Sequence, residues 1–162
     1  MDFERQVSRR LHEEHLATLD LWGRVEQAFA ARAKAWPPAR LDPELSTLLG
    51  RGAAALADEV TRHFEFEERE LFPRLAAAGE GDIAALLAEE HETIRAAARE
   101  FGTLAAGTLD GAGWRALRAL GLELAERLTA HVQKEEMALL PMLEDLLDAD
   151  ADRELALAYV ST

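Results

Sequence analysis

Two stretches of the chain repeat one combination of histidine and paired glutamates. Residues 63–75 read His-Phe-Glu-Phe-Glu-Glu-Arg-Glu-Leu-Phe-Pro-Arg-Leu, and residues 131–143 read His-Val-Gln-Lys-Glu-Glu-Met-Ala-Leu-Leu-Pro-Met-Leu. Both start with histidine, carry Glu-Glu four and five positions later, and then share leucine, proline and leucine in register. Before each stretch, a further histidine, His15 or His91, directly follows a Glu-Glu pair. The pattern predicts two copies of one unit, each with two histidines and a carboxylate.

This combination of side chains could bind metal. A histidine and a glutamate four residues apart lie on one face of a helix, about 6 Å apart along its axis. Four imidazoles and two carboxylates suit a pair of first-row transition metals, with the carboxylates bridging them. Iron is favoured, while manganese or zinc stays open, although zinc usually prefers a closed set of four ligands. The candidate metal ligands are His15, His63, Glu67, His91, His131 and Glu135.

These six residues fall where the apolar periodicity of the helices predicts a buried core. An unpaired carboxylate in the core would cost several kcal/mol or more. A single core histidine is more often hydrogen-bonded than metal-bound, but six polar residues on four apolar stripes, arranged as a repeat, are hard to explain in that way. The neighbouring acids are instead expected to face solvent: Glu13, Glu14, Glu65, Glu68, Glu70, Glu89 and Glu136.

The composition predicts a single all-α domain spanning residues 1–162. Alanine, leucine, glutamate and arginine are abundant, which favours helix. The absence of cysteine excludes thiolate ligands. Eighteen basic and 31 acidic residues give a net charge of −13, which disfavours nucleic acid and anionic membranes as partners. No apolar run approaches the roughly 20 residues of a membrane span. With no apolar signal core at the N-terminus, we expect a cytoplasmic protein.

Apolar residues three and four apart predict the helices that position the ligands. The first helix is expected over residues 3–34, ending at Trp36-Pro37-Pro38 because proline cannot continue the hydrogen-bond ladder. Asp42-Pro43-Glu44 predicts the start of the second, which Pro73 bends or ends. Gly79-Glu80-Gly81 predicts a turn, and Asp82 the N-cap of a third helix.

The third helix is expected to stop near Gly107, and the loop 110–113 leads to a fourth. Four long helices with short connections predict an up-down-up-down antiparallel four-helix bundle with a short C-terminal helix. That last helix is expected around residues 151–160 and covers one end of the bundle. The repeat divides the domain into two helical hairpins, at about residues 3–79 and 82–147.

The His-xxx-Glu-Glu-xx-Leu-x-Pro stretches and the Glu-Glu-His helix openings resemble the hemerythrin-like, or HHE cation-binding, family. The resemblance runs from the first helix through Pro141. It implies a four-helix bundle with a non-haem dinuclear iron centre that also has an oxo or hydroxo bridge from solvent. Carried over to this sequence, it implies four terminal ligands and two bridging carboxylates: His15, His63, His91 and His131, and Glu67 and Glu135.

One position departs from the pattern of the oxygen-carrying hemerythrins. These proteins have a second histidine one turn after the ligand on the third helix, where this chain has Arg95. The departure weakens the case for oxygen transport and resembles iron–sulfur-cluster repair proteins and other bacterial HHE proteins, although the repair proteins usually carry a cysteine-bearing N-terminal segment. His12 is an alternative fifth ligand, but its position on the helix flank favours a role outside the ligand set. Glu59 and Glu90 are expected to hydrogen-bond the ligand imidazoles.

The leading functional hypothesis is a diiron protein that binds or senses O2, nitric oxide or peroxide, in oxidative or nitrosative stress, with an unidentified redox partner. One alternative is a diiron enzyme of the peroxidase or nitric-oxide-reductase type, or an iron donor in iron–sulfur-cluster repair. Another is a helical module in which a redox-inert metal only stabilises the bundle.

Overall fold

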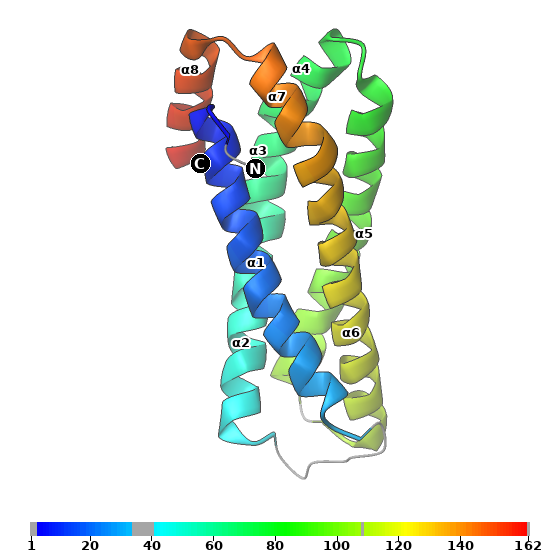
Figure 1. The fold of residues 1–162 in the computed structure, drawn as a ribbon. Coiled ribbons are helices and arrows are strands. Elements are labelled where there is room, and N and C mark those ends of the chain that lie inside the picture. Colours follow the sequence, from blue (N-terminus) through cyan, green and yellow to red (C-terminus); the bar gives the residue numbers. More distant parts are fainter. Residues whose placement is uncertain (1–2, 34–40, 108, 162) are drawn as a thin grey trace.

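The computed structural model describes residues 3–33, 41–107 and 109–161. Within these ranges the regular structure is helical throughout, with no strand, which confirms the predicted all-α class. The long helices pack side by side, and a short C-terminal helix lies against the outside of the first one (Figure 1). None of the described helices combines the length and the apolar character needed to cross a membrane.

The first helix, α1, spans Gln6–Ala30 and so begins later than the sequence predicts. Phe3 is buried without being helical. The backbone N–H groups of Gln6 and Val7 donate to the side chain of Asp152, both at 3.0 Å. A carboxylate from the other end of the chain therefore caps α1, whose own N-cap residue, Arg5, makes no side-chain cap. The helix also ends earlier than the predicted residue 34, because the described residues 31–33 are no longer helical. The predicted proline stop at residues 36–38 lies outside the described residues.

The second helical run begins as predicted at Asp42. Its Oδ1 accepts the N–H of Leu45 at 2.8 Å, and proline occupies the first turn. The run then continues without a break to Ala77 and contains two π-helical segments. Its segments are α2 Pro43–Asp58, η1 Glu59–His63, α3 Phe64–Phe66, η2 Glu67–Leu71 and α4 Phe72–Ala77.

Pro73 does not end this run, although the sequence allowed for that. In a regular α-helix the proline ring would clash with the carbonyl four residues earlier, which here belongs to Arg69. Arg69 lies in η2, where the π-type turn replaces the regular four-residue hydrogen bond with a five-residue one. Pro141 stands in the same relation to η3, so the repeated proline follows a repeated π-helical turn.

The remaining helices follow the predicted order with small shifts at their starts. The third helix begins at Gly81 and not after Asp82, which lies in its first turn, and Gly79 with φ 96° makes the preceding turn. The fourth begins inside the predicted loop because Asp110 caps it, accepting the N–H of Gly113 at 2.7 Å. These elements are α5 Gly81–Ala106, α6 Gly111–Lys134, η3 Glu135–Leu139, α7 Leu140–Leu146 and α8 Ala149–Val160.

The four long runs form a closed arrangement in which α1 contacts α2 and α6, and α5 contacts α2 and α6. Two apolar clusters fill the interior, one towards each end of the bundle. In α1, Leu11 belongs to one cluster and Trp22 to the other, with His15 between them. The same interruption occurs at His91, between Leu87 and Ile94 of α5. His15 and His91 therefore lie at the boundary between two apolar cores.

Candidate metal centre

The six predicted ligand residues come together in the middle of the bundle, and all are at most 2% exposed. They form two overlapping groups whose ligand atoms lie within 4.8 Å of one another. We call them site A and site B and refer to all six residues as the ligand cluster. Site A consists of His15, His63, Glu67 and Glu135, and site B of Glu67, His91, His131 and Glu135.

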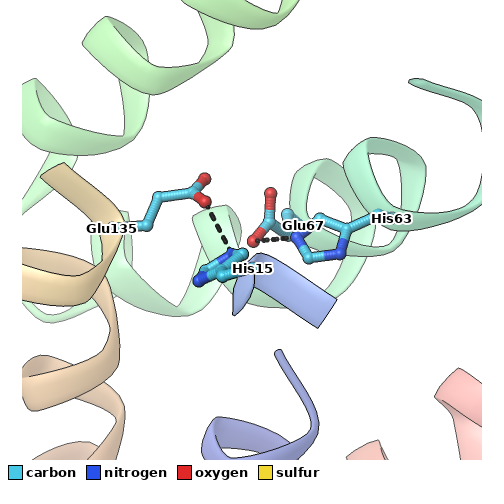
Figure 2. Close-up of side chains that lie close together, drawn as sticks. All are labelled: His15, His63, Glu67 and Glu135. Atoms are coloured by element: carbon cyan, nitrogen blue, oxygen red, sulfur yellow. Dashed lines mark ion pairs between the residues drawn. The ribbon is translucent and has the colours of Figure 1, made fainter. Parts of the chain in front are cut away.

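In site A, each histidine faces one carboxylate. His15 Nε2 lies 3.0 Å from Glu135 Oε2, and His63 Nε2 lies 3.2 Å from Glu67 Oε1. Figure 2 shows these four side chains pointing toward one another, with the two ion pairs dashed. Helices that are distant in the sequence supply them, so only the assembled bundle creates this site.

Site B uses the other oxygen of each carboxylate. Glu67 Oε2 lies 3.3 Å from His91 Nε2, and Glu135 Oε1 lies 3.0 Å from His131 Nε2. Each glutamate thus presents one oxygen to site A and the other to site B. This is the arrangement that a carboxylate shared by two metal ions requires.

The buried polar atoms of the cluster that make no hydrogen bond provide a test of whether metal ions fit there. Across the described part of the chain, seven buried side-chain nitrogen or oxygen atoms lack a hydrogen-bond partner, and five belong to the ligand cluster. They include both oxygens of Glu67 and the Nε2 atoms of His15 and His63. Buried polar atoms without hydrogen bonds are unfavourable, and cations bound between them would satisfy the five atoms of the ligand cluster. The nitrogen and oxygen donors present suit first-row divalent metals.

Each histidine of site A also donates a hydrogen bond outward, from Nδ1 to a glutamate on a neighbouring helical run. His15 donates to Glu136 at 2.6 Å and His63 to Glu14 at 3.2 Å. Such a bond fixes the orientation of the imidazole ring, directs Nε2 inward and raises its basicity as a ligand.

Site B repeats the arrangement, with His91 donating to Glu68 at 2.7 Å and His131 to Glu90 at 3.0 Å. Each of the four glutamates that accept these bonds is adjacent in sequence to a member of the ligand cluster. Its hydrogen bond, however, comes from a histidine on the next helical run. The four bonds therefore close a ring around the bundle. We call Glu14, Glu68, Glu90 and Glu136 the outer carboxylates.

The structure corrects the expectation that the acids beside the ligands only face solvent. Glu14, Glu68 and Glu136 each bind a ligand-cluster imidazole. Glu90 binds an imidazole as predicted, but that of His131 and not the adjacent His91. Glu59 is buried, yet its carboxylate lies 4.0 Å from His63 Nδ1 and accepts a hydrogen bond from Thr18 instead. The repeated Glu-Glu and Glu-His pairs were the sequence signal for the outer carboxylates.

Basic side chains form hydrogen bonds with the outer carboxylates. Arg95 donates from Nη1 and Nη2 to Glu68, at 2.8 and 3.1 Å, so it is directed at the outer carboxylate and is not one of the ligand-cluster residues. Lys134 donates to Glu90 at 2.6 Å. His12, the alternative fifth ligand, bonds through Nδ1 to Glu136 at 2.9 Å, which agrees with a role outside the ligand set.

The metal-free cluster holds protons strongly. Burial lowers the pKa of His15, but the nearby carboxylates of Glu135 and Glu136 outweigh burial and raise the pKa to about 9. The pKa of His91 also rises to about 9, because Glu135 and Glu67 outweigh its burial. Burial raises the pKa of Glu135, yet the neighbouring histidines hold it well below its usual range. Ligand histidines must lose their protons to bind metal, so loading is coupled to proton release.

A surface hollow of about 480 Å³ lies between α5 and α6. Glu90, Ile94 and Lys134 are among its lining residues, so it reaches the outer carboxylate that binds His131. No ligand-cluster residue lines it. The hollow therefore extends to the outer side of the Glu90–Lys134 pair and stops short of the ligand cluster.

Comparison with known families identifies the chain. The model of the hemerythrin HHE cation binding domain matches residues 6–143, and the chain belongs to this family. The predicted resemblance is thereby confirmed, and the buried histidine and glutamate groups are those of a cation-binding domain that could hold metal. A search of curated proteins gives no match. The matched residues end before α8, which begins at Ala149.

Proposed function

We propose that this chain is a non-haem dinuclear iron protein that binds or senses O2, nitric oxide or peroxide. The observation that carries the proposal is the disposition of Glu67 and Glu135, each of which presents one oxygen to site A and the other to site B. In this proposal Glu67 and Glu135 would each be shared by two ions, and each of the four histidines would hold one ion. Iron held by these residues would supply the electrons for binding such small molecules.

The chain's own residues determine the environment of the centre. The outer carboxylates orient the imidazoles and hold their Nδ1 protons, so that each Nε2 is available as a ligand. The apolar clusters on both sides keep bulk water away from the ligand cluster. An enclosed centre of this kind admits only small molecules, which supports a diatomic gas or peroxide as the ligand.

The proposal includes the finer features of the fold. We assign the chain a single domain with up-down-up-down antiparallel topology, composed of two hairpin repeats. In support, the π-helical turns η2 and η3 occupy matching positions in the repeats, Glu67–Leu71 and Glu135–Leu139. We also assign it to the cytoplasm, in oxidative or nitrosative stress, with electrons from a separate redox partner.

Metal analysis with optical spectroscopy tests the proposal. The anaerobic protein loaded with ferrous iron should hold two irons per chain, and its spectrum should change on exposure to O2 or nitric oxide. One tightly held zinc ion, with no second metal, would instead support a purely structural role. Turnover of peroxide or nitric oxide beyond one equivalent would favour the enzymatic alternative over a binding protein.

A further inference from the structure

The C-terminal helix α8 lies outside the matched family domain, yet it reaches the surroundings of site A. Its residue Tyr159 is 2% exposed and donates its hydroxyl proton to Glu14, the outer carboxylate of His63. The same hydroxyl lies 3.4 Å from Nδ1 of His63. Because a phenol has a pKa of about 10, Tyr159 is a proton donor at neutral pH.

One oxygen of Glu14 accepts hydrogen bonds from three donors. Oε2 accepts the hydroxyl of Tyr159, the Nη2 of Arg62 at 3.2 Å and the Nδ1 of His63 at 3.2 Å. The other oxygen, Oε1, accepts from Arg10 at 3.2 Å. The position of Glu14 toward His63 therefore depends on how firmly Tyr159 and the two arginines hold the carboxylate.

The tyrosine is itself fixed from several directions. The guanidinium carbon of Arg62 lies 4.9 Å from the ring centroid, and the ring of Phe66 packs edge-on at 4.6 Å. At the start of α8, Asp152 accepts the backbone N–H groups of Gln6 and Val7. Helix α8 is thus attached to α1 at one point near its start and to the surroundings of His63 at another.

We propose that Tyr159 is a positioning residue for site A, acting through Glu14 on His63, so that the C-terminal helix specifically strengthens metal binding at site A. Among the described residues, site B has no equivalent contact from α8: its outer carboxylates are held by Arg95 and Lys134, which lie on the bundle helices themselves. The inference rests on the proposed metal centre and adds to it an asymmetry between the two metal positions.

Stepwise cobalt(II) titration followed by visible absorption tests this inference. The binding step missing in His63→Ala marks site A. Changes in residues that bond to metal ligands typically cost 10–100-fold in metal affinity. Since Tyr159 acts one bond further out, Tyr159→Phe should weaken the site A step by about tenfold. The site B step should change by less than about twofold. Phenylalanine keeps the ring and its packing on Phe66, so the variant tests the loss of the hydroxyl group alone.

Two controls separate positioning from general stability. Lys134→Met removes the hydrogen bond that Lys134 donates to Glu90, the outer carboxylate of His131. This variant should weaken the site B step instead. Asp152→Ala removes the cap of α1 but keeps the Tyr159 hydroxyl, so it should lower the melting temperature and weaken the site A step much less than Tyr159→Phe does. In Glu14→Gln, adding Tyr159→Phe should have little further effect, because both changes remove the same link.

Several outcomes would overturn the inference. Equal weakening of both steps by Tyr159→Phe, no change in either, or full additivity with Glu14→Gln would each contradict a role through Glu14. A wild-type chain that binds fewer than two cobalt ions would refute the proposed centre and this inference with it. Two bound ions with an unaffected Tyr159→Phe variant would refute only the inference.

Discussion

Sites A and B share two carboxylates but differ in what surrounds their histidines. Beyond site A, Glu59 is buried and accepts a hydrogen bond from Thr18. When the two repeats are aligned on their histidines, the corresponding positions beside site B hold Arg127 and Ile94. Arg127 is partly exposed and pairs with Glu123, whereas Ile94 is buried and apolar. Site A therefore has an additional buried carboxyl group, and site B an apolar side chain and a surface ion pair.

The aromatic neighbours differ as well. At site B, the ring of Phe64 stacks on His91, with centroids 3.7 Å apart and planes 4° apart. At site A, His63 meets the edge of Tyr159, with centroids 6.4 Å apart. A sequence repeat has thus produced matching ligand sets in unequal environments. Since polarity and hydrogen bonding around a site tune metal affinity and redox potential, two metal ions bound here should be inequivalent.

The largest predicted effect comes from removing one of the two carboxylates that both sites share. Glu67→Ala or Glu135→Ala should each reduce the metal content from two ions per chain to one or none, because each glutamate contacts both sites. Elemental analysis of the purified variants checks this. His12→Ala, which changes a residue outside the ligand cluster, is the control and should keep both ions. Full retention of both metals in either glutamate variant would show that the carboxylates do not bridge.

A matched pair of outer carboxylates tests the sites separately. Glu14→Gln should weaken metal binding at site A, and Glu90→Gln at site B, each by roughly 10–100-fold. Both glutamates precede a histidine in sequence and bond to a histidine of the following helical run. The rate of metal release to a chelator gives the measurement. If each variant affected both sites alike, the outer carboxylates would act on the bundle as a whole.

Changing the pH should affect both sites together, since His15 in site A and His91 in site B both have a pKa raised to about 9 in the metal-free protein. A histidine whose pKa is higher in the folded than in the unfolded state stabilises the fold when it is protonated. This stabilisation is complete below the unfolded pKa, near 6.5, and is lost as the pH rises through 9. The metal-free protein should therefore melt at progressively lower temperature from pH 6.5 to 9.

The metal-loaded protein should show the opposite trend. Protons compete with metal for the imidazoles, so metal content should fall as the solution is acidified. Melting curves of both forms between pH 5 and 9 provide the check. The coupling would be refuted by a metal content that is constant down to pH 4, or by a metal-free protein whose stability does not decline toward pH 9.

The smallest effect concerns the attachment of α8. Asp152→Ala should reduce the free energy of unfolding by about 1–2 kcal/mol, the usual effect of losing a helix cap, because two backbone N–H groups of α1 lose their acceptor. Denaturant titration measures this change. Asp150→Ala is a suitable control, since Asp150 is largely exposed and pairs only with Arg153 among the described ion pairs. A stability loss as large in Asp150→Ala would point to the helix propensity of α8 and not to the cap.

Much of the fold followed from local patterns. The helical class, the cap at Asp42 and the inward position of the ligand cluster all depend on period and spacing within one helix. The π-helical turns were not predicted, because a π-type turn differs from an α-turn by a single residue and leaves little trace in the periodicity. They explain why the run containing Pro73 continues to Ala77.

The sequence by itself determined which residues could bind metal, because a buried polar residue at an apolar position needs a partner and the repeat supplied the same set twice. It did not determine what the neighbouring acids do. Glu14, Glu68 and Glu136 look like surface charges along their own helices, and only the packing of adjacent runs directs them to imidazoles. The contact of Tyr159 with Glu14 likewise joins residues far apart in the chain. Spacing along one helix fixes which side chains face inward, but only helix–helix packing fixes which partners they meet.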